Sequence, residues 1–166
     1  MNIYKKNIFL FFTMMLLCIS LTGCDNEVKD DFKHFLNVDL LTISSFESEA
    51  IDAFNAISKE NQSSEAYYQK LYSILTKTSI PQYQKFVDAL SKAKPTTNDV
   101  KQLHQIYLKG ANKQLESFKL FKEGIEEKNE YKISEANRLL AESKTYMNAY
   151  LKSAIDLSEE LDLKWR

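Results

Sequence analysis

The sequence contains little glycine, proline, cysteine or histidine. It has 3 glycines, 2 prolines, 2 cysteines and 2 histidines among 166 residues. A domain built from β-sheet needs turn residues at short intervals, so the scarcity of glycine and proline favours long helices. Both cysteines, Cys18 and Cys24, lie near the N-terminus. The rest of the chain can therefore form neither a disulfide nor a thiolate metal site.

The charges are nearly balanced, with 22 lysines and arginines against 23 aspartates and glutamates and a formal net charge of −1. Binding to nucleic acid depends on an excess of basic residues, which this chain lacks. We therefore expect no nucleic-acid partner. The carboxylates lie in runs along the predicted helices, which is typical of solvated helix faces.

Histidine occurs only at His34 and His104. Neither follows a glutamate at the Glu-x-x-His spacing of di-iron bundles. The sequence also lacks the Cys-x-x-Cys-His motif of covalently bound haem and a Gly-x-Ser-x-Gly nucleophile motif. These patterns predict no catalytic residues, no metal ligands and no cofactor, and we expect that the protein is not an enzyme.

The N-terminus combines a positive region with an apolar run and small residues. Two lysines at 5–6 precede an apolar run over 8–21, which is short for a membrane span of roughly 20 residues. Leu21-Thr22-Gly23-Cys24 follows and resembles the lipobox of bacterial lipoproteins. The resemblance implies that residues 1–23 are a signal peptide. It also implies that Cys24 carries acyl chains such as palmitate, which anchor the protein on the extracytoplasmic face of the cell membrane.

The remaining chain is long enough for one ordinary domain. Residues 24–43 are expected to form the lipidated cysteine, a polar tether and an irregular lead-in, because the apolar residues after Asp31 have mixed spacing. Residues 44–166 are predicted to form the helical domain. Its first helix begins near Ser44, since Glu47 follows at the three-residue spacing of a capping box.

Three more amphipathic stretches follow. The second runs from Ser64 to Lys94, and Pro81 predicts that it is kinked or split. The third begins near Asp99 and continues beyond Gly110. The fourth carries a seven-residue repeat of Ile133, Leu140, Met147, Ala154 and Leu161. Such a repeat with short loops predicts an all-α fold, an antiparallel bundle of about four helices.

Tyrosine provides the candidate binding surface, since all but one of the nine tyrosines follow Cys24. Tyr67 and Tyr68 are adjacent, so they point about 100° apart on a helix and cannot both face the core. An exposed tyrosine offers apolar area with a hydrogen-bonding tip. We predict a binding patch of Tyr67, Pro81, His104 and Tyr107 near the break in the second helix.

Together these patterns predict a membrane-anchored helical lipoprotein that acts as a non-catalytic binding or interaction module of the cell envelope. Its expected partners are the membrane, through the lipid anchor, and a protein or other envelope component. The alternative is a carrier that holds a small molecule or metal within the bundle, and an enzyme is the third possibility. Abundant amphipathic surface and sparse catalytic groups favour the binding module.

Overall fold

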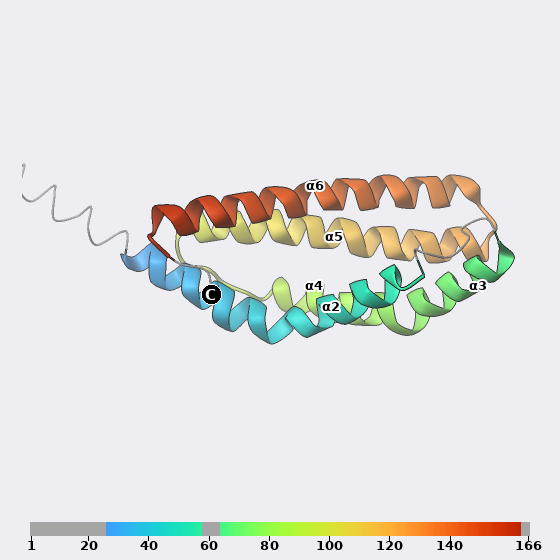
Figure 1. Cartoon of the computed structure of the whole chain (residues 1–166), viewed down its shortest axis with the longest axis horizontal. Helices are drawn as coiled ribbons and strands as arrows, with labels where there is room; N and C mark the ends of the chain where they lie inside the picture. Colours follow the sequence, from blue (N-terminus) through green and yellow to red (C-terminus); the bar gives the residue numbers. More distant parts are fainter. Residues whose placement is uncertain (1–25, 58–63, 164–166) are drawn as a thin grey trace, which may run out of the picture.

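The computed structural model describes residues 26–57 and 64–163, which form helices joined by short turns (Figure 1). Cys24 and the apolar run before it lie outside the described residues. No strand is present in the described ranges, and none of the helices found there has the length and apolar character needed to cross a membrane. The predicted all-α bundle is confirmed.

The first rod is already helical at residue 26, the first residue that the structure describes, which is much earlier in the chain than expected. Residues 26–34 are helical and continue through the π-helical turn η1 (Phe35–Leu40) into α2 (Leu41–Asn55). The expected irregular lead-in is instead part of the bundle, because Phe32 and Phe35 lie three residues apart on one face and are both fully buried.

The predicted helix start at Ser44 is wrong. Ser44 lies within α2, and its hydroxyl donates a hydrogen bond to the carbonyl of Leu41 at 3.0 Å. Glu47 does not reach back to form a capping box. Its side chain faces Tyr107 on another helix. The three-residue spacing of Ser44 and Glu47 therefore lies inside a continuous helix and does not mark a helix start.

The predicted second helix is split near Pro81, as expected. Ser64 accepts a hydrogen bond from the backbone at the start of α3 (Glu65–Ile74). A second π-helical turn, η2 (Leu75–Ser79), then leads into α4 (Ile80–Leu90), with Pro81 in its first turn. Proline lacks an N–H and clashes with the carbonyl four residues earlier. The wider turn before it accommodates the ring while the chain stays helical.

The last two helices form an antiparallel hairpin. The helix α5 (Asn98–Glu126) is followed by a three-residue turn and α6 (Glu130–Glu160). Lys128 in this turn has a φ of 52°, and the Asn129 side chain accepts hydrogen bonds from the first backbone N–H groups of α6. The residues of the predicted seven-residue repeat are all buried or half-buried.

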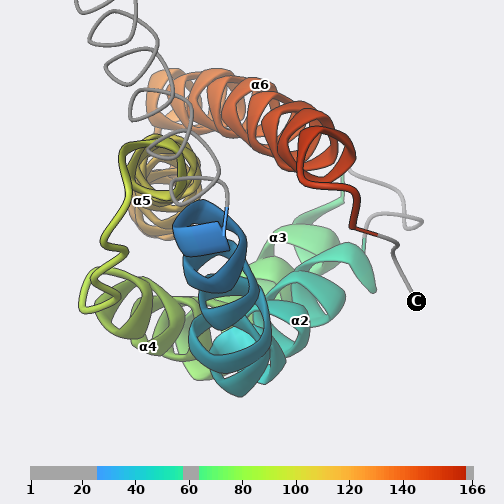
Figure 2. The ribbon, with the colours of Figure 1, turned by 90° about the vertical axis from the view of Figure 1, so that its left-hand side faces the viewer.

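The helices form two layers that share α5. Figure 2 shows α5 and α6 on one side of the bundle and the first rod with α4 on the other. α5 packs against α6, α4 and α3, whereas α6 packs mainly against α5. The first rod packs mainly against η2 and α4. α5 therefore connects α6 to the remainder of the bundle.

Small residues line the contact between α5 and α6. Gly110, Ser117 and Gly124 are spaced by seven on α5, and Ala136 and Ser143 are spaced by seven on α6. We call these five residues the small-residue seam. The Ser117 hydroxyl donates to the Ala136 carbonyl at 2.7 Å, and the Ser143 hydroxyl donates to the Gly110 carbonyl at 2.9 Å. Each helix thus hydrogen-bonds to the backbone of the other.

The two glycines of the seam are required for the close approach of the helices. A Cβ atom added at Gly110 would lie 2.9 Å from Tyr146 Cβ, and one added at Gly124 would lie 2.9 Å from Ile133 Cγ1. A Cβ atom cannot rotate away, so any larger residue at Gly110 forces α6 to move away from α5.

A cluster that we call the end clamp ties the first rod to the end of this hairpin. The Asp31 carboxylate accepts hydrogen bonds from the backbone N–H groups of Thr96 and Thr97 and from the Thr97 hydroxyl, at 2.7–3.1 Å. The Lys29 ammonium donates to the carbonyl of Leu161 at 2.8 Å. Partial burial raises the pKa of Asp31, but the hydrogen bonds outweigh it and lower the pKa below its ordinary value. Asp31 thereby satisfies backbone donors at the start of α5.

The seam predicts that Gly110→Val destabilises the protein. The added branched side chain meets Tyr146 and Met147, and such overpacking lowers the free energy of unfolding by about 1–3 kcal/mol. Denaturant titration measures the change. Asn112→Val, at an exposed position of the same helix, controls for the helix propensity of valine. Equal stability of the two variants would contradict the close packing.

Candidate functional site

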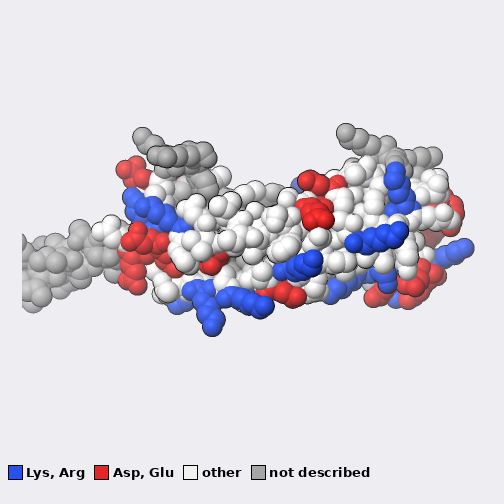
Figure 3. Space-filling view, turned by 90° about the horizontal axis from the view of Figure 1, so that it is seen from below, with Lys and Arg blue, Asp and Glu red and all other residues white. Residues whose placement is uncertain are grey.

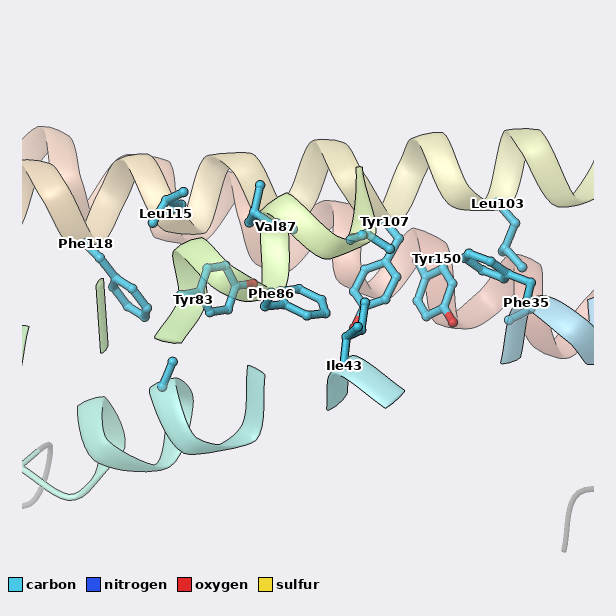
Figure 4. Packing of buried hydrophobic residues seen from close by; sticks show 14 of the residues in the cluster. Phe35, Ile43, Tyr83, Phe86, Val87, Leu103, Tyr107, Leu115, Phe118 and Tyr150 are labelled. Carbon is cyan, nitrogen blue, oxygen red and sulfur yellow. The ribbon is translucent and has the colours of Figure 1, made fainter. Parts of the chain in front are cut away.

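A row of aromatic side chains fills the interior between the two layers (Figure 4). Ring centroids are 5.3 Å apart for Tyr83 and Phe86 and 5.6 Å apart for Phe86 and Tyr107. Tyr107 and Tyr150 are stacked, with centroids 4.3 Å apart and an interplanar angle of 14°. The rings come from α4, α5 and α6, so they join elements that are distant in the sequence.

A single carboxylate reaches into this aromatic row. Glu47 of α2 is half-buried and accepts a hydrogen bond of 2.6 Å from the Tyr107 hydroxyl. Glu47 was expected at a helix start, yet it follows buried Ile43 by four residues and precedes buried Ala50 by three. That helical spacing is the signal that places it on the inner face. We call Glu47, Tyr83, Tyr107 and Tyr150 the acid–tyrosine cluster.

Burial and mutual charge effects shift the pKa values of the whole cluster. Burial raises the pKa of Glu47, and the hydrogen bond from Tyr107 offsets this rise in part. Burial also raises the pKa values of Tyr83, Tyr107 and Tyr150, and the negative charge of Glu47 raises them further. The three phenols therefore stay protonated at neutral pH and act as hydrogen-bond donors or acceptors.

The hydroxyl of Tyr83 is the least satisfied polar group of the cluster. Tyr83 is fully buried, and within the described part of the chain its hydroxyl has no hydrogen-bond partner. Leaving a buried hydroxyl unpaired costs roughly 1–3 kcal/mol. The group is thus chemically disposed to bond to a water or another small polar molecule.

The structure does not bring the four residues of the predicted patch together. Tyr67 lies on α3 at one end of the bundle, whereas His104 lies in the second turn of α5 toward the other end (Figure 1). Tyr67 is half-buried and packs edge-to-face against Tyr68, with centroids 5.5 Å apart. Pro81 is exposed on α4, and Tyr107 is buried at its bond with Glu47.

His104 supports the fold at the end of α4. Its Nε2 atom lies 2.8 Å from the carbonyl oxygen of Leu90, which can only accept, so Nε2 carries the proton. The imidazole also packs edge-to-face against Phe35, with centroids 5.8 Å apart. The ring therefore closes the last turn of α4 and covers part of the core, and it does not form part of an open patch.

Exposed apolar side chains mark other parts of the surface. Leu151 and Ile155 on α6 are 54% and 46% exposed, and they lie one helical turn apart. We call them the aliphatic pair. They lie beside the positions of the seven-residue repeat, so packing of the repeat does not explain why they are apolar.

Among the described residues, no group of three or more His, Cys, Asp or Glu side chains is placed to hold a metal ion.

The family model of EMYY-motif containing lipoproteins matches residues 5–162, nearly the whole chain. The chain belongs to this family. Its single Tyr-Tyr pair stands in Glu65-Ala66-Tyr67-Tyr68, which agrees with three of the four letters in the family's name. No curated protein and no solved structure matches the chain. The predicted bacterial lipoprotein is confirmed, and the lipoprotein associates with a membrane through its anchor.

The acid–tyrosine cluster of the lipoprotein predicts a pH-dependent stability. Folding raises the pKa of Glu47, so the folded state binds a proton at this carboxyl more tightly than the unfolded state does. The resulting stabilisation is fully present below the ordinary pKa of 4.5 and is lost as the pH rises through the folded-state pKa. Glu47→Gln keeps an oxygen acceptor for Tyr107, and because glutamine does not titrate, the stability of this variant does not fall with the deprotonation of position 47. Its free energy of unfolding relative to wild type should therefore increase between about pH 4 and about pH 7.

Chemical denaturation at both pH values measures this difference. Glu49→Gln removes a carboxylate from the exposed side of the same helix and controls for the loss of one charge. A Glu47→Gln variant whose relative stability is the same at both pH values would show that the carboxylate is well solvated.

Proposed function

We propose that this membrane-anchored lipoprotein is a non-catalytic binding module of the cell envelope. In this proposal residues 1–23 are removed, Cys24 carries the lipid, and the bundle is displayed on the extracytoplasmic face. The lipobox-like residues Leu21-Thr22-Gly23-Cys24 support the site of lipidation. The two-layer bundle provides long helices whose surfaces are available to a partner protein.

The aliphatic pair carries the proposal of a protein partner. Leu151 and Ile155 are about half exposed although each is a large apolar side chain. α6 packs mainly against α5, so the opposite flank of α6 is available for contact. Apolar side chains one turn apart are the anchors by which a helix binds a hydrophobic groove. Because each side chain is already about half buried, covering the rest of it would contribute about half of the 1.5–3 kcal/mol for a fully exposed one, or roughly 1 kcal/mol.

A small-molecule carrier is the second candidate. The unpaired, fully buried hydroxyl of Tyr83 supports it, since a carrier needs a polar group inside the bundle that can bind cargo. The neighbouring Glu47 would accept a hydrogen bond from such a cargo. The aliphatic pair has no role in this alternative, which separates the two functions experimentally.

The site of lipidation predicts that Cys24→Ser abolishes fatty-acid labelling and membrane retention, because the acyl chains are attached to the Cys24 sulfur. Metabolic labelling with a clickable fatty acid, followed by membrane fractionation, measures both properties. Cys18→Ser is the matched control and should be labelled like wild type, since Cys18 lies in the segment proposed to be removed. Labelling that persists in Cys24→Ser would place the lipid elsewhere.

A photo-reactive amino acid at Ile155 should cross-link to a discrete protein partner in intact cells, because its side chain would lie inside the interface. The same group at Asn137, an exposed residue earlier on α6, should give no such adduct. Gel shift and mass spectrometry identify the adducts. Identical patterns at both positions would contradict the interface, and a small molecule that co-purifies with wild type but not with Tyr83→Phe would favour the carrier.

A further inference from the structure

The first rod carries an exposed face without charge. Every exposed residue between positions 37 and 48 is uncharged. Figure 3, which views the bundle from the side of α2 and α4, shows a broad uncharged area beside the charged groups near the N-terminal end. By contrast, charged residues such as Asp99, Lys109 and Glu126 occur among the exposed residues along the whole of α5. The uncharged helix face consists of Asn37, Val38, Leu41, Thr42, Ser44, Ser45 and Ser48.

Three of the four hydroxyl groups on this face donate hydrogen bonds within their own helix. Thr42 donates to the carbonyl of Val38 at 2.8 Å, Ser44 donates to that of Leu41 at 3.0 Å, and Ser48 donates to that of Ser45 at 3.2 Å. A hydroxyl whose proton is already bonded loses less when it leaves water. The uncharged helix face is therefore less polar than its composition suggests.

Two large apolar side chains project from the same face. Leu41 is 67% exposed and Val38 is 47% exposed. They are followed along the rod by the small side chains of Ser45 and Ser48, which allow another surface to approach the helix closely. An uncharged helical surface with protruding aliphatic groups can enter the boundary between lipid headgroups and acyl chains.

The position of this face relative to the anchor favours the membrane as its partner. Cys24 precedes Asn26, the first described residue of the rod, by only two residues, which span at most about 7 Å. Leu41 lies about 22 Å further along the rod. The end clamp fixes the rod to α5 and α6 through Asp31 and Lys29. The orientation of the rod at the bilayer therefore sets the orientation of the whole bundle.

We propose that the uncharged helix face lies against the lipid bilayer, so that the bundle lies along the membrane and does not stand on its end. The proposal rests on the lipidation of Cys24. It deepens the proposed function because it assigns one side of the protein to lipid. The aliphatic pair on α6, in the other layer of the bundle, then remains available to a protein partner.

Site-specific fluorescence on the full-length lipidated protein tests the orientation. The chain has no cysteine after Cys24, whose sulfur is occupied by lipid, so an introduced cysteine can be labelled alone with an environment-sensitive dye. Leu41→Cys reports on the proposed contact. Tyr131→Cys, at the other end of the bundle on α6 and 79% exposed, is the matched control. Both are reconstituted in vesicles of phosphatidylcholine and phosphatidylglycerol that contain a spin-labelled lipid.

The dye at position 41 should shift its emission to the blue and be quenched by the spin-labelled lipid, whereas the dye at position 131 should show neither change. A dye at Ser45→Cys should be quenched in the same way. Adding Leu41→Glu should abolish that quenching because it places a charge in the contact, and adding Leu151→Glu should leave the quenching unchanged.

Vesicle association with equal quenching at positions 41 and 131 would overturn the proposed orientation and leave the lipidation intact. Failure to associate with vesicles would overturn both proposals. A dye at position 41 that becomes shielded with rising protein concentration in detergent, without lipid, would assign the face to a second copy of the chain and would also overturn the membrane contact.

Discussion

The bundle depends on the close approach of α5 and α6, because α5 is the main connection between α6 and everything else. Backbones approach closely only where side chains are small, and the small-residue seam supplies such positions at seven-residue intervals. The serines of the seam add hydrogen bonds from each helix to the backbone of the other. With one side occupied in this way, α5 presents larger residues such as Tyr107 and Phe118 to the other layer.

Much of the fold could be predicted where the sequence keeps a single helical period. The regular spacing of apolar residues correctly predicted α5 and α6, and Pro81 correctly predicted the break between α3 and α4. The first rod could not be predicted in the same way, because η1 is π-helical and places extra residues in its turns. The apolar residues before and after Leu36 therefore fall out of phase with a regular α-helix, although Phe32 and Ile43 are both buried.

The candidate site was harder to predict because it depends on contacts between distant segments. Helical spacing indicates that Glu47 faces inward, but only the tertiary structure shows that Tyr107 bonds to it. His104 has the polarity of a surface residue, yet it caps α4 through Leu90. The predicted patch required the start of the second helical stretch to lie near the start of α5. Tyr67 instead lies near the other end, because α3 lies beside the last turns of α5, where Tyr72 reaches Glu126.

The end clamp has a consequence for biogenesis. Lys29 bonds to a carbonyl 132 residues further along the chain, and Asp31 bonds to backbone groups 65 and 66 residues away. Synthesis proceeds from the N-terminus, so the first rod is made first and completes these contacts last. The hairpin of α5 and α6, whose partners are close in sequence, forms with a smaller loop-closure cost. The first rod therefore cannot complete its docking until nearly the whole chain has been synthesised.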